Sequence, residues 1–193
     1  MIIGITGGTG CGKTTLLRMI EARGGLILDC DAIYHDLLKT DTSLLTAIEE
    51  RFPGTVECGV LQRKKLGAIV FSDPAALADL NRITHRAVRD AVLCKLLTRP
   101  KLAAIDAIAL FESGLAELCD VTVAVIAPTE DRVRRLMARD GITEEYARSR
   151  ICAQPVNDWY RANCDHVLEN DDSFDAFATK CLAFLESIGI IEP

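Results

Sequence analysis

Residues 7–14 read Gly-Gly-Thr-Gly-Cys-Gly-Lys-Thr, and this octapeptide decides the fold. It matches the pattern G-x-x-x-x-G-K-[S/T] at every fixed position, directly after an apolar run and before an amphipathic stretch. The glycines allow a loop whose backbone N–H groups face inward, and the helix N-terminus that follows favours an anion. The alternative is a flexible glycine-rich turn. Because the flanking residues fit a strand and a helix, the sequence predicts a phosphate-binding loop.

The residue types in this loop indicate how it would bind ATP. Lys13 would bridge the terminal phosphates, and the Thr14 hydroxyl would ligate Mg²⁺. A second metal ligand is expected at Asp106, which ends an apolar run as an acidic residue ends a Walker B strand, although many buried strands end in Asp. The residues of this segment expected to bind ATP are Gly8, Thr9, Gly10, Cys11, Gly12, Lys13, Thr14 and Thr15.

Short apolar runs alternate with longer helix-like stretches along the chain, which indicates an α/β protein. Five runs lack helical periodicity and are typical of buried parallel strands. They cover residues 1–6, 25–29, 102–107, 121–126 and 166–168. We therefore predict a P-loop three-layer fold with a five-stranded parallel sheet, with helices at about 12–23 and from Pro128 onward.

The connection between the second and third predicted strands is too long for a simple crossover. Residues from about 31 to 100 contain no convincing buried strand, and turn signals at 53–54, 58–59 and 72–74 divide them into several helices. We predict a single P-loop domain with its core at 1–30, 101–128 and 162–193. The helical insertion at about 31–100 would bind the acceptor, and a helical lid would cover about 129–161.

Composition limits the partners. The 193 residues carry a formal net charge of -6, which argues against a broad binding surface for nucleic acid. No signal peptide or membrane span is visible, so we expect a cytoplasmic protein without a membrane partner, and no protein partner is evident. The eight cysteines are scattered without a C-x-x-C pair, which favours buried thiols over disulfides or zinc.

The phosphate-binding loop leaves several functional classes open. A GTPase would need N-K-x-D and D-x-x-G, and the chain contains neither; L-S-G-G-Q is also absent. A small-molecule kinase remains, with a non-catalytic ATP-sensing module as its rival.

Arginines support phosphate transfer. Arg132, Arg135 and Arg139 are spaced three and four residues apart, so they lie along one face of a helix. A mobile lid usually carries such residues to the transferring phosphate. We expect Arg139 to be catalytic, with Arg132, Arg135 and Arg148 as secondary candidates; Arg150 follows Arg148 closely. The alternative is a solvated helix whose arginines pair with nearby carboxylates.

Two carboxylates flank Cys30 after the second predicted strand. If the chain there is still extended, the side chains of Asp29 and Asp31 share one face and point toward the loop. Ligands of open α/β sheets bind at the carboxyl ends of strands, so Asp31 is the expected base for an acceptor hydroxyl. The alternative is that Asp31 caps the following helix, and the two roles are not exclusive.

Together these residues resemble the dephospho-CoA kinase family over nearly the whole chain. The family's P-L-L-x-E resembles residues 108–112, with Ile108 in place of proline, and the basic residue that usually follows its A-Q pair falls on Tyr160. The segments that carry the resemblance are 6–14 (T-G-G-x-G-x-G-K-[ST]), 29–31 (D-x-D), 61–63 (L-x-R), 71–74 (F-x-[DN]-P), 80–85 (L-N-x-x-x-H), 135–140 (R-x-x-x-R-[DN]), 153–154 (A-Q) and 164–170 (A-D-x-V-I-x-N).

The resemblance implies transfer of the ATP γ-phosphate to the ribose 3′-hydroxyl of dephospho-CoA, with Mg²⁺. It implies acceptor-binding roles for Asp31, Arg63, His85 and Glu112, and it places Asn170 near the adenine site with Arg135 on the ATP side. A nucleoside or nucleotide kinase would share the loop, the metal site and the lid, and stays the alternative for the acceptor.

Overall fold

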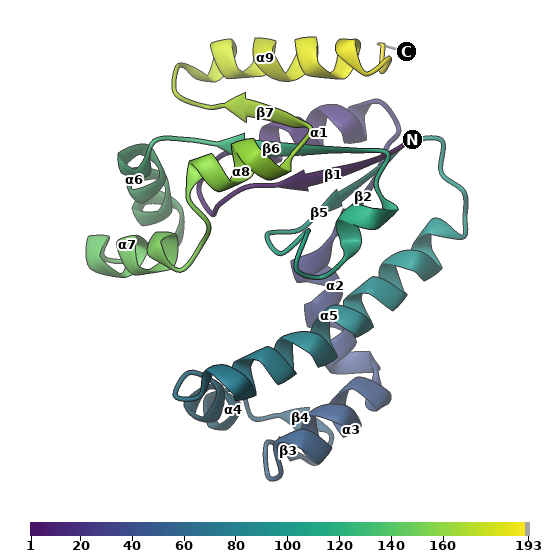
Figure 1. The fold of residues 1–193 in the computed structure, drawn as a ribbon, viewed down its shortest axis with the longest axis vertical. Coiled ribbons are helices and arrows are strands. Elements are labelled where there is room, and N and C mark those ends of the chain that lie inside the picture. The colour runs from purple at the N-terminus through teal and green to yellow at the C-terminus, as the bar shows by residue number, and fades with distance from the viewer. Residues whose placement is uncertain (192–193) are drawn as a thin grey trace. The chain divides into compact units, whose positions relative to one another are not determined.

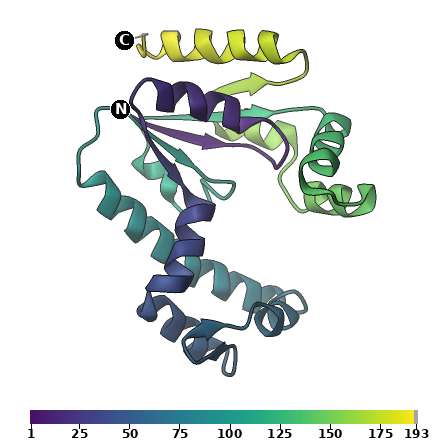
Figure 2. The same ribbon diagram turned by 180° about the vertical axis from the view of Figure 1, so that it is seen from behind.

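The computed structural model describes residues 1–191, drawn as ribbons in Figures 1 and 2. The chain divides into two compact units. The first contains Met1–Leu28 and the residues from Pro100 onward, and the second contains Asp29–Arg99.

A five-stranded parallel sheet organises the first unit, as predicted. Its order is β2-β5-β1-β6-β7, which places the first strand in the centre. Ile5 of β1 is in register with Asp106 of β5 on one side, and Thr6 is in register with Ala124 of β6 on the other. The strands are β1 (Ile2–Thr6), β2 (Leu26–Asp29), β5 (Ala103–Asp106), β6 (Val121–Ile126) and β7 (His166–Glu169).

Alternating side chains give this sheet two apolar faces, which explains its continuously hydrophobic strands. Ile3 and Ile5 of β1 are fully buried in a core with Leu16 of α1 (Lys13–Ala22) and Phe177 of α9 (Phe174–Ser187). On the opposite face, Tyr160 of α8 (Asn157–Asn163) packs with buried residues of β6. Helices therefore cover both faces, giving the predicted three layers.

Two helices follow β6 and form a small core of their own. Helix α6 (Thr129–Asp140) ends at Gly141, whose φ of 64° lies in the left-handed region that favours glycine at a helix C-terminus. Helix α7 (Glu144–Cys152) then packs against it through Val133, Leu136, Ala147 and Ile151. A 3₁₀ turn at Leu115–Leu118 precedes β6.

The second unit is mainly helical. Its helices are α2 (Cys30–Thr40), α3 (Thr42–Arg51), α4 (Arg63–Val70) and α5 (Pro74–Leu96). Aspartates cap three of them: Asp29, Asp41 and Asp73 each accept backbone N–H groups at the N-termini of α2, α3 and α5. The core contains Leu38, Leu45, Ile48, Phe52 and Leu66.

A short hairpin in this unit has no counterpart in the predicted helices. Strands β3 (Val56–Glu57) and β4 (Val60–Leu61) pair antiparallel around Cys58 and Gly59, whose φ values are 50° and 76°. Two positive φ angles are what a two-residue hairpin loop requires. Because the strands have two residues each and none is buried, they carry no periodic apolar signal.

The eight cysteines all lie within the described residues and are free thiols. Among residues 1–191, no helix has the length and apolar character needed to cross a membrane.

Candidate active site

The glycine-rich loop joins β1 to α1 in a conformation that its glycines permit. Gly7 has a φ of 128°, and a Cβ atom there would lie 2.1 Å from the carbonyl oxygen of Val125. Gly12, with a φ of 99°, is the N-cap residue of α1, and no side chain caps this helix. The Nζ atom of Lys13 donates to the carbonyl oxygen of Gly7 at 2.9 Å. This hydrogen bond links Lys13, at the end of the loop, to Gly7, the first residue of the loop.

Strand ends bring polar groups to this loop. Asp106 ends β5, and its Oδ1 lies 4.0 Å from the Nζ of Lys13. Asn170 follows β7; it is buried, and its Nδ2 donates to the carbonyl oxygen of Cys11 at 2.8 Å. Thr14 is exposed in the first turn of α1. The carboxyl edge of the sheet thus gathers Lys13, Asp106 and Asn170, as ligand sites of open α/β sheets do.

These residues fit Mg²⁺ in the presence of a nucleotide. Within residues 1–191 no cluster of three or more histidine, cysteine or acidic side chains could hold a metal. Mg²⁺ needs no such cluster, because it keeps water and phosphate ligands and uses one or two protein oxygens. A carboxylate beside the loop lysine and a hydroxyl at the helix start are such a donor set.

Thr9 is held on both sides of its backbone. Its N–H donates to the Oε1 of Gln154 at 2.9 Å, and its carbonyl oxygen accepts from the Nε of Arg132 at 2.9 Å. The Nη2 of Arg132 donates to the same Gln154 oxygen at 2.7 Å. Arg132 is only 3% exposed. Arg132, which the sequence suggested as a secondary candidate for phosphate binding, is therefore a buried residue that supports the loop in this structure.

The other arginines of α6 have different surroundings. Arg135 donates to the Oδ1 of Asn170 at 3.2 Å and to the carbonyl oxygen of Gly10 at 3.3 Å. Arg139 is exposed and pairs with Asp140. Of the predicted face, Arg132 and Arg135 thus donate to the loop, whereas Arg139 pairs with its neighbour on the helix.

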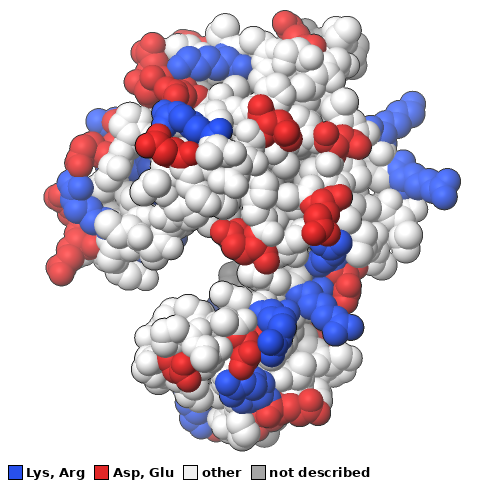
Figure 3. Space-filling model, viewed as in Figure 1, with Lys and Arg blue, Asp and Glu red and all other residues white. Residues whose placement is uncertain are grey.

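Arg148 and Arg150 also have carboxylate partners. Arg148 pairs with Glu130 and Glu144, and Arg150 donates to Asp140 at 2.9 Å. Figure 3 shows basic and acidic side chains side by side in the region of α6 and α7.

The thiol of Cys11 lies within the loop but is nearly inaccessible. Burial raises its pKa, although Arg132 and Lys13 act in the opposite direction. The thiol is therefore neutral at physiological pH and fills space beneath the loop.

Comparisons with known proteins agree with this geometry. The family model described as dephospho-CoA kinase matches residues 1–176. A dephospho-CoA kinase of Anaeromyxobacter dehalogenans is 39% identical over 185 residues, which cover 93% of this chain and 88% of the relative. The chain belongs to the dephospho-CoA kinase family.

Solved structures extend the likeness to three dimensions. A crystal structure from Thermus thermophilus is 34% identical with a TM-score of 0.83, covering 98% of this chain and 97% of the other. The dephospho-CoA kinase from Campylobacter jejuni is 25% identical with a TM-score of 0.67, covering 97% and 96% of the two chains.

The second unit of this family member carries the paired aspartates. Cys30 already begins α2, so the chain is not extended between Asp29 and Asp31 as expected. The Oδ1 of Asp29 accepts from the backbone N–H of Ala32 at 3.0 Å. The prediction that Asp31 could cap the helix is therefore wrong, because Asp29 caps it. Asp31 is an exposed residue of the first turn.

Arg63, predicted to bind the acceptor, lies at a hollow of about 270 Å³ in the second unit. Its Nη2 lies 3.2 Å from the Nδ1 of His35. Apolar side chains including Leu38, Leu61 and Leu66 line the same hollow. His85 lies half-buried on α5 and does not line it.

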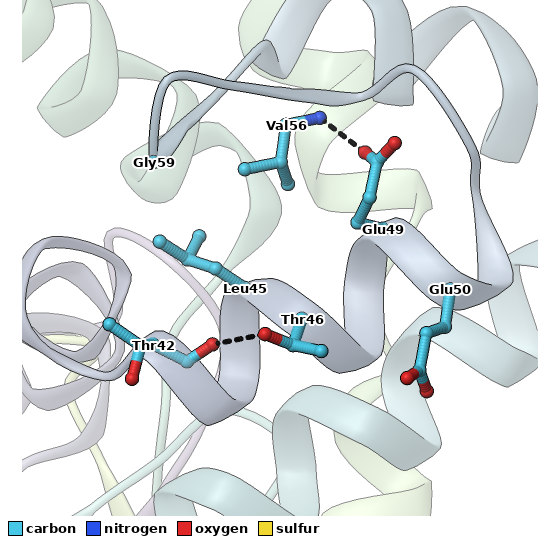
Figure 4. A pocket seen from close by; sticks show the side chains of 7 residues that line it. All are labelled: Thr42, Leu45, Thr46, Glu49, Glu50, Val56 and Gly59. Carbon is cyan, nitrogen blue, oxygen red and sulfur yellow. Dashed lines mark hydrogen bonds between the residues drawn. The ribbon is translucent and has the colours of Figure 1, made fainter.

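A second hollow in this unit has a volume of about 400 Å³. Figure 4 shows the residues that line it. Two of its polar side chains are bonded within the protein: Glu49 accepts from the backbone N–H groups of Gly54 and Val56, and Thr46 donates to the carbonyl oxygen of Thr42. The bonds of Glu49 tie the start of the hairpin to α3, which is a structural role.

One of the two departures from the family pattern, at Ile108, lies between β5 and the 3₁₀ turn, and the other, at Tyr160, lies in α8. The carbonyl oxygen of Ile108 accepts from the Thr6 hydroxyl at 3.1 Å, so the loop is anchored to β1 without proline. Glu112 is exposed. Tyr160 is fully buried, and its hydroxyl has no hydrogen-bond partner among the described residues. Burial raises its pKa to about 12.

Gln154 is the site residue to which sequence reasoning gave no role. Its only signal was the A-Q pair of the family pattern. Its distance of 145 residues from Thr9 along the chain hides their contact.

Proposed function

We propose that this family member transfers the γ-phosphate of ATP to the ribose 3′-hydroxyl of dephospho-CoA, forming CoA and ADP. The observation that carries the proposal is the loop of residues 7–14 at the carboxyl ends of the parallel strands, with Lys13 beside Asp106. Family membership supports the acceptor.

In this proposal the loop residues bind the phosphates of ATP. Lys13 exchanges its bond to the Gly7 carbonyl for the terminal phosphates and stabilises charge that develops on them. Mg²⁺ bound with ATP would neutralise part of the charge on the β- and γ-phosphates, held by Thr14 and Asp106. Arg135 and Asn170 border the nucleotide.

On the acceptor side, Asp31 orients the 3′-hydroxyl and takes its proton as the new oxygen–phosphorus bond forms and ADP leaves. Arg139 stabilises the transferring phosphate. Arg63, His85 and Glu112 bind the acceptor. We assign acceptor binding to the insertion at about 31–100 and closure to the lid at about 129–161.

We also propose that the protein acts in the cytoplasm. Eight free cysteines fit a reducing compartment, where disulfides rarely persist.

The acceptor is tested by measuring ADP formation with dephospho-CoA, with nucleosides and with nucleoside monophosphates at matched concentrations. Dephospho-CoA should give the highest kcat/KM, and Lys13→Ala should abolish the signal. A higher kcat/KM with a nucleoside monophosphate would instead identify the protein as a nucleotide kinase. ATP binding without ADP release in the presence of any acceptor would indicate a sensing module.

A further inference from the structure

The hydrogen bonds of Thr9, Arg132 and Gln154 form a closed ring at the start of the nucleotide loop. The Gln154 side-chain oxygen accepts from both other residues, at 2.9 Å from the Thr9 backbone and 2.7 Å from Arg132. The ring closes where Arg132 donates through Nε to the Thr9 carbonyl oxygen at 2.9 Å. Both backbone hydrogen-bonding groups of Thr9 are therefore held by side chains from outside the loop.

The ring lies in a closely packed place. A Cβ atom on Gly8 would lie 2.1 Å from the Nη2 of Arg132 and 3.0 Å from the Oε1 of Gln154. The backbone of Arg132 also packs on Gly10, where a Cβ atom would lie 3.0 Å from the Arg132 carbonyl oxygen. Glycine at these two positions thus lets the loop and the start of α6 approach each other this closely.

The buried, charged side chain of Arg132 needs the Gln154 oxygen as a hydrogen-bond acceptor. A buried guanidinium without an acceptor is costly, and the Gln154 oxygen is one of the two acceptors it has here. Without that oxygen, the Nη2 of Arg132 and the Thr9 N–H lose their shared partner together. The loop start would then be free to leave the position in which the structure holds it.

We propose that Gln154 is a positioning residue for nucleotide binding, which acts through Thr9 and Arg132 to hold the loop in its binding-competent conformation. This inference rests on the proposed function only in that the loop binds ATP. When a fraction of molecules has the competent loop, the apparent Kd rises by the inverse of that fraction. Saturating ATP recovers those molecules, so kcat changes little.

The test compares Gln154→Met, which keeps the unbranched shape and loses the strong acceptor, with Gln154→Glu, which keeps an acceptor. Titration with MgATP in the absence of any acceptor substrate should show Kd raised about 10–100-fold in the methionine variant and within about threefold of wild type in the glutamate variant. Turnover at saturating ATP should stay within about threefold in both. Because the titration uses no acceptor, its result is independent of which acceptor is correct.

Asn163→Ala is the matched control, since this exposed side-chain amide donates to the Trp159 carbonyl oxygen within its own helix, α8. Its Kd should equal that of wild type. Wild-type Kd in Gln154→Met, or an equal loss in Gln154→Glu, would overturn the proposal. So would a lower kcat at unchanged Kd, which is the mark of a smaller folded fraction.

If Gln154→Met does not fold, hydrogen exchange in the wild-type protein tests the same hydrogen bonds. Hydrogen exchange of the Thr9 amide in nucleotide-free protein should be slow, although Thr9 lies outside regular secondary structure. Exchange at the rate of an exposed loop would contradict the ring.

Discussion

Arg139 and its neighbour Asp140 form a bidentate pair at the end of α6: Nε and Nη2 of the arginine donate to the two carboxylate oxygens at 2.6 and 3.0 Å. The same carboxylate accepts from Arg150 at 2.9 Å. These hydrogen bonds, led by that from Arg139, lower the pKa of Asp140 to about 2. A depressed carboxyl pKa keeps its pairing intact above the ordinary value near 4 and loses it as the pH falls toward 2. The pair is therefore present throughout the neutral range.

Arg139→Ala should lower kcat by about 10²–10³-fold, the usual loss when one donor to the transition state is removed, with ATP KM nearly unchanged. Steady-state kinetics measure this. Arg134→Ala is the control, because Arg134 is exposed on the same helix and pairs with Asp131 of the same turn. If Arg139→Ala changes KM alone, Arg139 binds the ground state and the transition state equally well and does not lower the barrier.

Gly8→Ala should weaken MgATP binding at least as much as Gln154→Met. The added Cβ would overlap Arg132 at 2.1 Å, so the ring around Thr9 must open. Isothermal titration of MgATP measures the loss. Gly67→Ala, in helix α4, is the control: its Cβ would meet only Phe71, at 3.4 Å, and alanine favours the helix. Unchanged affinity in Gly8→Ala would mean that the loop tolerates an open ring.

Much of the first unit was predictable from sequence. The five strands are apolar on both faces, and the loop between β1 and α1 has a motif whose residues are adjacent in the chain. The contacts of Arg132 and Gln154 were not predictable, because spacing along a helix places three arginines on one face without saying which is buried. The hairpin around Cys58 was missed since its strands are too short for a periodic pattern.

The paired aspartates illustrate the same limit. The motif D-x-D indicated two functional carboxylates, but their roles depend on where the helix begins. An extended chain would have aligned both side chains, whereas a helix starting at Cys30 makes Asp29 its cap and leaves Asp31 in the first turn. Helix boundaries are uncertain by a residue or two in sequence analysis, and here one residue decides which aspartate is bonded.

Tyr160→Phe should raise the free energy of unfolding by up to about 1–3 kcal/mol, because it removes a buried hydroxyl that lacks a partner and leaves the ring in place. Thermal and urea unfolding measure this at pH 7. Tyr146→Phe, at an exposed position, should stay within about 0.5 kcal/mol of wild type. Destabilisation by Tyr160→Phe would reveal that the hydroxyl is bonded in solution.

The same variant has a distinctive pH dependence. The pKa of Tyr160 is raised to about 12 from an ordinary value of 10. Wild type therefore loses relative stability as the pH rises from about 10 toward 12, because the unfolded chain releases the phenol proton first. Phenylalanine has no such proton. The stability difference between Tyr160→Phe and wild type should widen over this interval, and a constant difference would contradict the raised pKa.

Asp31→Asn and Asp29→Asn together test the assignment of the base. Asp29 accepts the Ala32 N–H as the N-cap of α2, and asparagine caps helices as well as aspartate does. Asp29→Asn should therefore keep both stability and turnover, while Asp29→Ala should cost about 1 kcal/mol of stability.

Asp31 is exposed in the first turn and does not cap the helix, so Asp31→Asn should leave the fold intact. If Asp31 takes the proton of the 3′-hydroxyl, its amide cannot, and kcat should fall by about 10²–10⁴-fold with little change in ATP affinity. Unfolding curves and kcat for the three variants separate these roles. Full turnover in Asp31→Asn with an inactive Asp29→Asn would reverse the two assignments, and full turnover in both would remove the pair from the chemistry.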